Sequence, residues 1–105
     1  MFSEGTISRV WQKGRASRDH DAGEWRQDEC GAWMRRSQYG DAHAEFGWKI
    51  ESVAAGAADD VDSLRPFHIA NEYNVAAGRA HCRVTADRTG LTGDAHTTVP
   101  RNREV

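Results

Sequence analysis

The chain of 105 residues has the length of one small domain, and its composition is that of a folded protein. Hydrophobic residues make up 38% of it and charged residues 29%, which argues against an intrinsically disordered chain. The formal net charge is −2, with acids and bases mixed along the sequence. Nucleic acid is therefore not expected as a partner, because its binding depends on an excess of Lys and Arg. No apolar run approaches membrane-spanning length, so no membrane partner is expected and the predicted location is cytoplasmic.

The first predicted element is an amphipathic helix over residues 3–15. Ser3 can cap its start and Gly14 can end it. Its apolar residues recur at helical spacing: Ile7, Val10 and Trp11. After a polar loop, residues 24–36 are predicted to form a second helical or irregular segment, in which Gly31 weakens one continuous helix.

Two strands and a third helix are predicted next. Apolar residues alternate with others from residue 46 and indicate a half-buried strand that ends near Val53. Residues 63–67 are predicted as a second, edge-like strand, because Pro66 cannot donate a hydrogen bond to a sheet. Residues 68–77 have helical periodicity, with Gly78 as the stop.

The C-terminal part contributes little to the predicted fold. Residues 83–85 are predicted as a last short strand. From Thr89 to Val105 the chain is polar and lacks periodicity, so we expect a disordered tail. The expected organisation is one domain over residues 1–88 followed by a tail over 89–105.

Two cysteines, Cys30 and Cys82, lie far apart and neither belongs to a CxxC motif. A zinc site of the knuckle type is therefore excluded. Free thiols are expected, because thiols are kept reduced in the cytosol, and a disulfide between the two is the alternative.

Several segments, in one order, resemble small bacterial HNH nucleases. Asp28–Met34 reads D-E-C-G-A-W-M, Tyr39–Asp41 reads Y-G-D and Phe46–Ile50 reads F-G-W-K-I. The corresponding segments of the nucleases read D-x-C-G-A-W-I, Y-G-[ND] and Y-G-W-E-I-D-H-I. Val10–Arg15, Asp59–His68 and His81–Ala86 are similar to further family segments, so the resemblance covers about residues 7–88.

This resemblance implies an α+β protein with an HNH-like ββα-metal finger, two short strands followed by a helix, preceded by N-terminal helices. In such a site a histidine at the end of the first strand acts as general base, and a divalent metal stabilises the developing charge. Here the family's catalytic positions are occupied by other residues: Glu51, Ser52, Ser63, Glu72 and Val75. Ser52 stands where the family has its general base, and it does not titrate near neutrality. The chain is therefore predicted to be a pseudo-nuclease rather than an enzyme, with no catalytic residue, no metal ligand and no cofactor.

A weak metal site is the alternative at these positions. Glu51, Glu72 and His68 are residue types that hold divalent ions. The simpler interpretation, which we favour, is that His68 and Glu72 form an ordinary surface pair one helical turn apart.

Released from catalysis, such a protein is expected to act by binding another protein. The family's association with phages and mobile elements implies an inhibitor of a bacterial defence complex, such as an anti-CRISPR protein. The predicted partner-binding residues are acidic: Glu51, Asp59, Asp60, Asp62 and Glu72. The same residues also fit a plain solvated turn at the start of a helix.

Two other functions are considered. Residual nucleic-acid binding needs Arg35, Arg36, Arg65 and Arg79 on one basic face. A divergent metal-dependent endonuclease needs Glu51 and Glu72 together with an unusual base.

Overall fold

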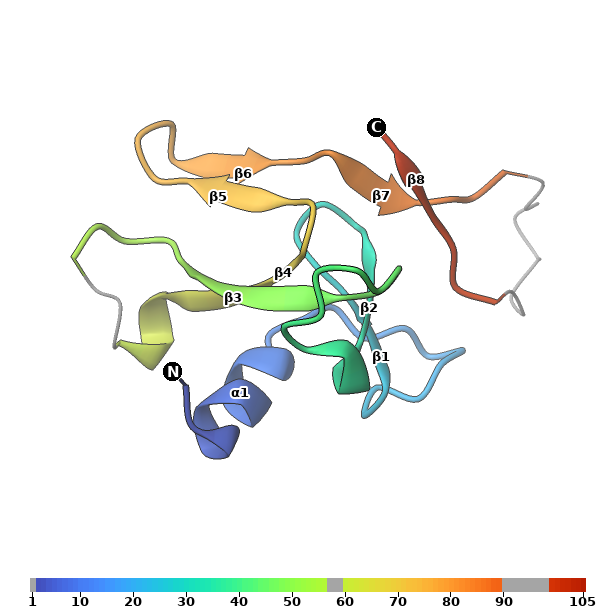
Figure 1. The fold of residues 1–105 in the computed structure, drawn as a ribbon, viewed down its shortest axis with the longest axis horizontal. Coiled ribbons are helices and arrows are strands. Elements are labelled where there is room, and N and C mark those ends of the chain that lie inside the picture. Colours follow the sequence, from blue (N-terminus) through green and yellow to red (C-terminus); the bar gives the residue numbers. More distant parts are fainter. Residues whose placement is uncertain (1, 57–59, 90–98) are drawn as a thin grey trace.

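The computed structural model describes residues 2–56, 60–89 and 99–105, and in this part of the chain four antiparallel strand pairs accompany one α-helix (Figure 1). The elements are α1 (Glu4–Trp11), β1 (Trp25–Gln27), β2 (Trp33–Arg35), the 3-10 turn η1 (Arg36–Gln38), β3 (Trp48–Ser52), the 3-10 turn η2 (Val61–Ser63), β4 (Leu64–His68), β5 (Glu72–Asn74), β6 (Arg79–His81), β7 (Val84–Ala86) and β8 (Asn102–Glu104). None of these elements is a helix long and apolar enough to cross a membrane.

Helix α1 begins where the sequence predicts. The Ser3 side chain accepts a hydrogen bond from the backbone N–H of Thr6, which satisfies one of the free N–H groups of the first turn. The predicted apolar face is confirmed, since Ile7, Val10 and Trp11 are all buried. The helix is shorter than expected, because its regular part ends at Trp11 and two tighter turns follow up to Gly14.

The β3–β4 hairpin is the centre of the molecule. Its register runs from Trp48 opposite His68 to Ser52 opposite Leu64, so both predicted strands are confirmed. Helix α1 packs on one side of this hairpin, and β5 contacts it from the other side (Figure 1). The hairpin is thus covered by a helix on one side and by a second hairpin on the other.

The core forms around Trp48, which is completely buried. Its ring centre lies 5.0 Å from that of Trp11 and 4.8 Å from that of Tyr39. Both pairs are tilted, an arrangement that aromatic rings prefer over direct face-to-face stacking. The indole N–H of Trp48 donates to the backbone carbonyl of Arg36 at 3.3 Å, so its polar atom is also satisfied. The remaining buried members of this cluster are aliphatic: Ile7, Val10, Met34 and Leu64.

Residues 24–36 form a hairpin, and the expectation of a second helical segment here was wrong. β1 and β2 pair with Trp25 opposite Arg35 and Gln27 opposite Trp33. The tight connection uses Gly31 at a φ of 82°, a left-handed conformation that glycine adopts without steric cost. With one helix in the described part, the predicted set of N-terminal helices is also corrected.

The predicted helix over residues 68–77 is absent, and with it the ββα finger. His68 ends β4, and the chain then forms the β5–β6 hairpin, with Tyr73 opposite Ala80. The helical pattern of the sequence is overridden by hydrogen bonds within the hairpin turn. The backbone carbonyl of Asn74 accepts the N–H of Gly78, and its side-chain oxygen accepts the N–H of Ala77. The HNH-like fold class was therefore wrong for this chain.

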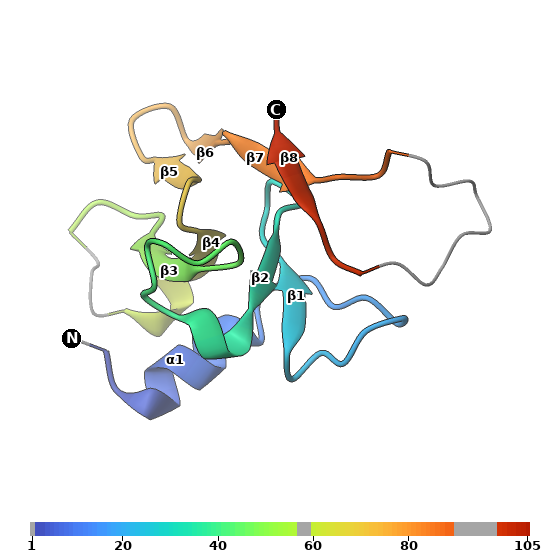
Figure 2. The same ribbon diagram turned by 45° about the vertical axis from the view of Figure 1, so that its right-hand side comes forward.

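The C-terminal part is ordered where the structure describes it. The predicted strand near residues 83–85 is β7, which pairs with β8, Thr85 lying opposite Arg103. The side-chain amide of Asn102 accepts from the N–H of Trp33 at 2.7 Å and donates to its carbonyl at 3.0 Å. A disordered tail was therefore the wrong expectation for residues 99–105, while residues 90–98 lie outside the described part. In both views the β7–β8 pair lies at the opposite end of the molecule from α1 (Figures 1 and 2).

The Gly47→Ala variant is expected to fold poorly. A Cβ added at Gly47 would lie 2.0 Å from the carbonyl oxygen of Asp41, a clash with backbone that no side-chain rotation relieves. We expect a loss of about 3 kcal/mol or more in the free energy of unfolding, measured by urea denaturation. Gly5→Ala is the matched control, because Gly5 is a helical residue whose added Cβ has open space except for Ser3 Oγ at 3.9 Å. It should raise stability by roughly 0.5–1 kcal/mol.

Candidate functional site

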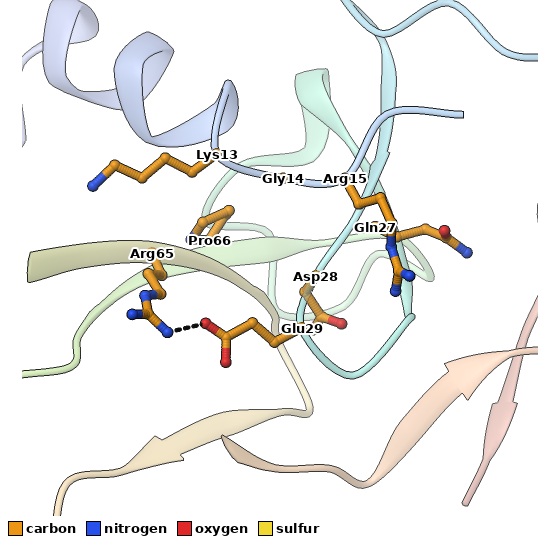
Figure 3. Close-up of a pocket in the computed structure, with 8 residues that line it drawn as sticks. All are labelled: Lys13, Gly14, Arg15, Gln27, Asp28, Glu29, Arg65 and Pro66. Atoms are coloured by element: carbon orange, nitrogen blue, oxygen red, sulfur yellow. Dashed lines mark hydrogen bonds and ion pairs between the residues drawn. The ribbon is translucent and has the colours of Figure 1, made fainter. Parts of the chain in front are cut away.

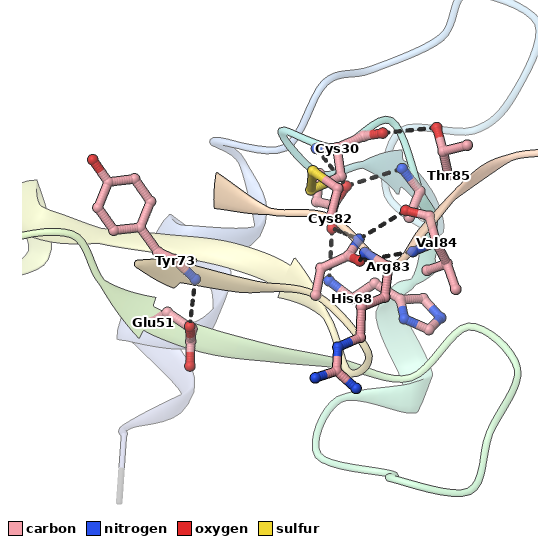
Figure 4. Close-up of a disulfide and its surroundings, with 11 residues drawn as sticks. Cys30, Glu51, His68, Tyr73, Cys82, Arg83, Val84 and Thr85 are labelled. Atoms are coloured by element: carbon pink, nitrogen blue, oxygen red, sulfur yellow. Dashed lines mark hydrogen bonds between the residues drawn. A yellow bond between two sulfur atoms is a disulfide. The ribbon is translucent and has the colours of Figure 1, made fainter. Parts of the chain in front are cut away.

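The positions expected to be degenerate catalytic residues do not form a site. Glu51 lies on β3, where one carboxylate oxygen accepts the backbone N–H of Tyr73 at 2.8 Å and the other lies 3.7 Å from Lys49 Nζ (Figure 4). Ser52 donates its hydroxyl to the carbonyl of Ala54 and stabilises the turn after β3. These two side chains therefore hold β5 and a turn in place.

The other three positions lie on the periphery. Ser63 ends η2 and its hydroxyl reaches a carboxylate oxygen of Asp60 at 3.5 Å. Glu72 is exposed on β5, and Val75 lies in the turn after that strand with 42% of its surface exposed. The predicted pairing of His68 with Glu72 on one helix does not occur, because His68 is a buried residue at the end of β4.

Two of the predicted acidic contact residues are already engaged within the chain. Glu51 binds as described above, and Asp60 accepts the N–H of Asp62 as the cap of η2. Asp62 and Glu72 are exposed, and Asp59 lies outside the described residues. Across the described residues, no three His, Cys, Asp or Glu side chains gather as metal ligands would.

Asp28 is a buried and highly connected polar residue, to which the sequence assigned no role of its own. It is 3% exposed, and its two carboxylate oxygens accept four hydrogen bonds. One oxygen accepts the N–H groups of Cys30 and Ala32, both at 2.9 Å. The other accepts the N–H of His68 and the amide N–H of Asn71, also at 2.9 Å. A buried carboxylate is tolerated when donors replace its lost water, and here they come from two segments far apart in sequence.

Asn71 extends this network to β7. It is fully buried, and its side-chain oxygen accepts the N–H groups of Arg83 at 2.7 Å and Val84 at 3.0 Å. Its amide donates to Asp28 and to the carbonyl of Val84. One N–H of this amide therefore binds the loop after β1, and its other hydrogen bonds join the turn after β4 to the start of β7.

His68 is equally committed. One ring nitrogen lies 2.8 Å from the carbonyl oxygen of Glu45, and the other accepts the N–H of Ala70 at 3.0 Å. Both nitrogens serve to hold neighbouring loops.

Cys30 and Cys82 form a disulfide beside this network, so the expectation of free thiols was wrong (Figure 4). Their Cα atoms lie 5.5 Å apart although 52 residues separate them in sequence. The Thr85 hydroxyl donates to the carbonyl of Cys30 at 2.7 Å, so the same two segments are joined next to the bridge as well. The spacing of the two cysteines in the sequence does not indicate this disulfide. The two cysteines meet because the contact between Asp28 and Asn71 brings their segments together.

A pocket of about 450 Å³ opens on the surface near Asp28 (Figure 3). It is lined by Lys13, Gly14, Arg15, Gln27, Asp28, Glu29, Arg65 and Pro66. Lys13 donates to the carbonyls of Val61 and Leu64, and Arg65 is ion-paired with Glu29. The guanidinium of Arg15 forms no hydrogen bond or ion pair with the residues that the structure describes. The pocket thus offers one uncommitted cation, suited to a carboxylate or phosphate oxygen.

No protein family, no curated protein and no solved structure matches this chain.

The Asn71→Asp variant tests the network. It keeps the shape of the side chain but replaces the amide donor by a carboxylate facing Asp28. We expect a loss of at least about 2–3 kcal/mol in the free energy of unfolding at neutral pH. Part of this loss should return on acidification, because protonating one of the two carboxyl groups removes their repulsion.

Asn74→Asp is the matched control, because Asn74 is exposed and its side-chain oxygen, retained in aspartate, accepts the N–H of Ala77. It should change stability by less than about 0.5 kcal/mol. Equal losses in the two variants, measured by urea denaturation at neutral and acidic pH, would contradict the role given to Asn71.

The disulfide is checked by intact mass after alkylation without reductant. We expect neither cysteine to be alkylated until a reductant is added. Cys30→Ser combined with Cys82→Ser should lower the free energy of unfolding by up to about 4 kcal/mol, because the bridge closes a long loop in the unfolded chain. Alkylation of both thiols in the folded, unreduced protein would refute the pairing.

Proposed function

We propose that this protein acts by binding another protein and not by catalysis. The observation that carries the proposal is the full commitment of its buried polar residues: Asp28, His68 and Asn71 spend their hydrogen-bonding groups on the chain itself. A general acid or base must reach a proton of the substrate from a free lone pair or N–H. The interior therefore supports a rigid scaffold, and the surface is left for function.

Nucleic-acid binding through the basic face considered above receives less support. Arg35, Arg36 and Arg65 are ion-paired with Glu24, Glu4 and Glu29. Arginines neutralised within the chain displace fewer counterions from phosphates. A protein partner agrees better with the mixed surface charge, and an inhibitor of a nucleic-acid-processing defence complex is its narrower form, based on the HNH resemblance alone.

The proposal is tested by co-purification. A tagged copy expressed in its host, with the lysate treated with nuclease before capture, is expected to retain a protein in stable stoichiometry. The nuclease treatment matters because it removes partners bridged by nucleic acid. Recovery of nucleic acid alone from an untreated lysate, with no protein retained after treatment, would sink the proposal.

The same preparation is assayed on supercoiled plasmid with Mg²⁺, Mn²⁺, Ni²⁺ or Zn²⁺, and no nicking above a blank is expected. Glu51→Gln is the control, because the amide oxygen can still accept the N–H of Tyr73. Nicking by the natural protein that this variant loses would establish a metal-dependent nuclease instead.

A further inference from the structure

Arginines gather at the C-terminal end of the chain. Five of them follow Gly78: Arg79, Arg83, Arg88, Arg101 and Arg103. All five are exposed. We call β7 and β8 with their flanking residues, 83–89 and 99–105, the C-terminal ribbon.

Three other arginines of the described part are ion-paired, whereas Arg9, Arg15, Arg18 and Arg26 are not. The ion pairs among the described residues join Arg35 to Glu24, Arg36 to Glu4, Lys49 to Glu51 and Arg65 to Glu29. None of the five C-terminal arginines takes part in an ion pair with the described residues. Arg101 donates to the carbonyl of Thr89 at 3.3 Å and Arg103 to that of Glu104 at 3.0 Å, so each guanidinium keeps further N–H donors for an external partner.

Asn102 fixes the direction in which this charge points. Its side chain binds the backbone of Trp33 and so faces the body of the protein. Successive side chains of a strand point to opposite sides, so Arg101 and Arg103 point away from the body. The Asp87 carboxylate is nearby: the Thr89 N–H and hydroxyl that donate to it lower its pKa, and the charges of Arg101 and Arg103 add to this effect.

Apolar side chains lie among these charges. Val99 and Val105, with 78% and 74% of their surface exposed, are the most exposed large hydrophobic residues of the described part. Arginine beside exposed apolar groups is typical of protein interfaces, where arginine is enriched and lysine depleted. The ribbon has no aromatic residue on which a base could stack. These features favour a protein partner over nucleic acid.

We infer that the C-terminal ribbon is the docking surface of this protein and that it receives an acidic protein surface, with Arg101 and Arg103 as the central contacts. This rests on the proposed function and adds the place of contact and the chemistry of the partner. A planar guanidinium group can pair with a carboxylate of the partner through two parallel hydrogen bonds. The exposed valines would contact apolar groups of the same partner. The ribbon is held in position by the Cys30–Cys82 bridge and the Asn71 contacts, so it meets its partner preorganised.

The test compares two double variants with the same change in net charge. Arg101→Gln with Arg103→Gln alters the ribbon, whereas Arg9→Gln with Arg18→Gln removes two exposed arginines elsewhere. Labelled poly-L-glutamate serves as the carboxylate probe and a DNA duplex of equal charge as the phosphate probe, both followed by fluorescence anisotropy at low salt. We expect the natural protein to bind poly-L-glutamate. The ribbon variant should weaken this binding by about tenfold or more, and the control by less than about twofold.

Three outcomes overturn the inference. Equal weakening by both variants shows a general charge effect, and absence of poly-L-glutamate binding removes the acidic partner. Tighter binding of the duplex, lost in the ribbon variant, assigns the ribbon to nucleic acid. Circular dichroism and the intact disulfide confirm that each variant is folded.

The co-purification separates this inference from the proposed function. If the ribbon variant retains the host protein as well as the control does, the docking surface lies elsewhere and the proposed function stands. If the natural protein retains no host protein, the proposed function itself fails.

Discussion

The structure depends on one buried carboxylate, that of Asp28, and on the amide of Asn71 that faces it. A carboxylate with 3% exposure has lost its water and is stable only while four donors replace it. Those donors come from the turn after β1 and from the end of β4, which are about forty residues apart in sequence. One oxygen is satisfied within its own turn, but the other is satisfied only when folding brings the two segments together.

This contact also explains why the chain leaves β4 as it does. A helix beginning at His68 would place Asn71 in its first turn, where its side chain would face water or the helix backbone. In the structure Asn71 turns inward and binds Asp28 together with both Arg83 and Val84. Residues 72–81 are then free to pair as β5 and β6. The disulfide lies beside the same junction and joins the loop of Asp28 to the segment that Asn71 holds. Such bridges persist in oxidising compartments, and the cytoplasm, which the sequence led us to expect, is not one of them.

Elements set by local pattern could be predicted from the sequence, and those set by distant contacts could not. The Ser3 cap and the face of Ile7, Val10 and Trp11 define α1, and alternation around Trp48 defines β3, because both patterns act between neighbours. The helical spacing of Ile69, Tyr73 and Ala76 was equally regular but lost to Asn71, whose partners lie 12 to 43 residues away. The pairing of Cys30 with Cys82 and the capping of Trp33 by Asn102 likewise have no local signal. The candidate site followed from resemblance, and three of its five positions, Glu51, Ser52 and Ser63, lie on or beside strands as expected. Glu72 and Val75 were expected on a helix and lie instead on β5 and in the turn after it.

The separation between interior and surface has a consequence for function. The buried polar residues Asp28, His68 and Asn71 are spent on holding loops, and Glu51 is tied to Tyr73. Several cations take part in no ion pair with the described residues, and among them Arg15 in the pocket and Arg101 and Arg103 on the C-terminal ribbon are exposed. A small domain gains little from surface ion pairs, so leaving these arginines unpaired costs almost no stability. The same arginines gain far more when a partner removes them from water and supplies carboxylates in the right geometry. The distribution of charge therefore favours a protein whose stability and whose binding are carried by different residues.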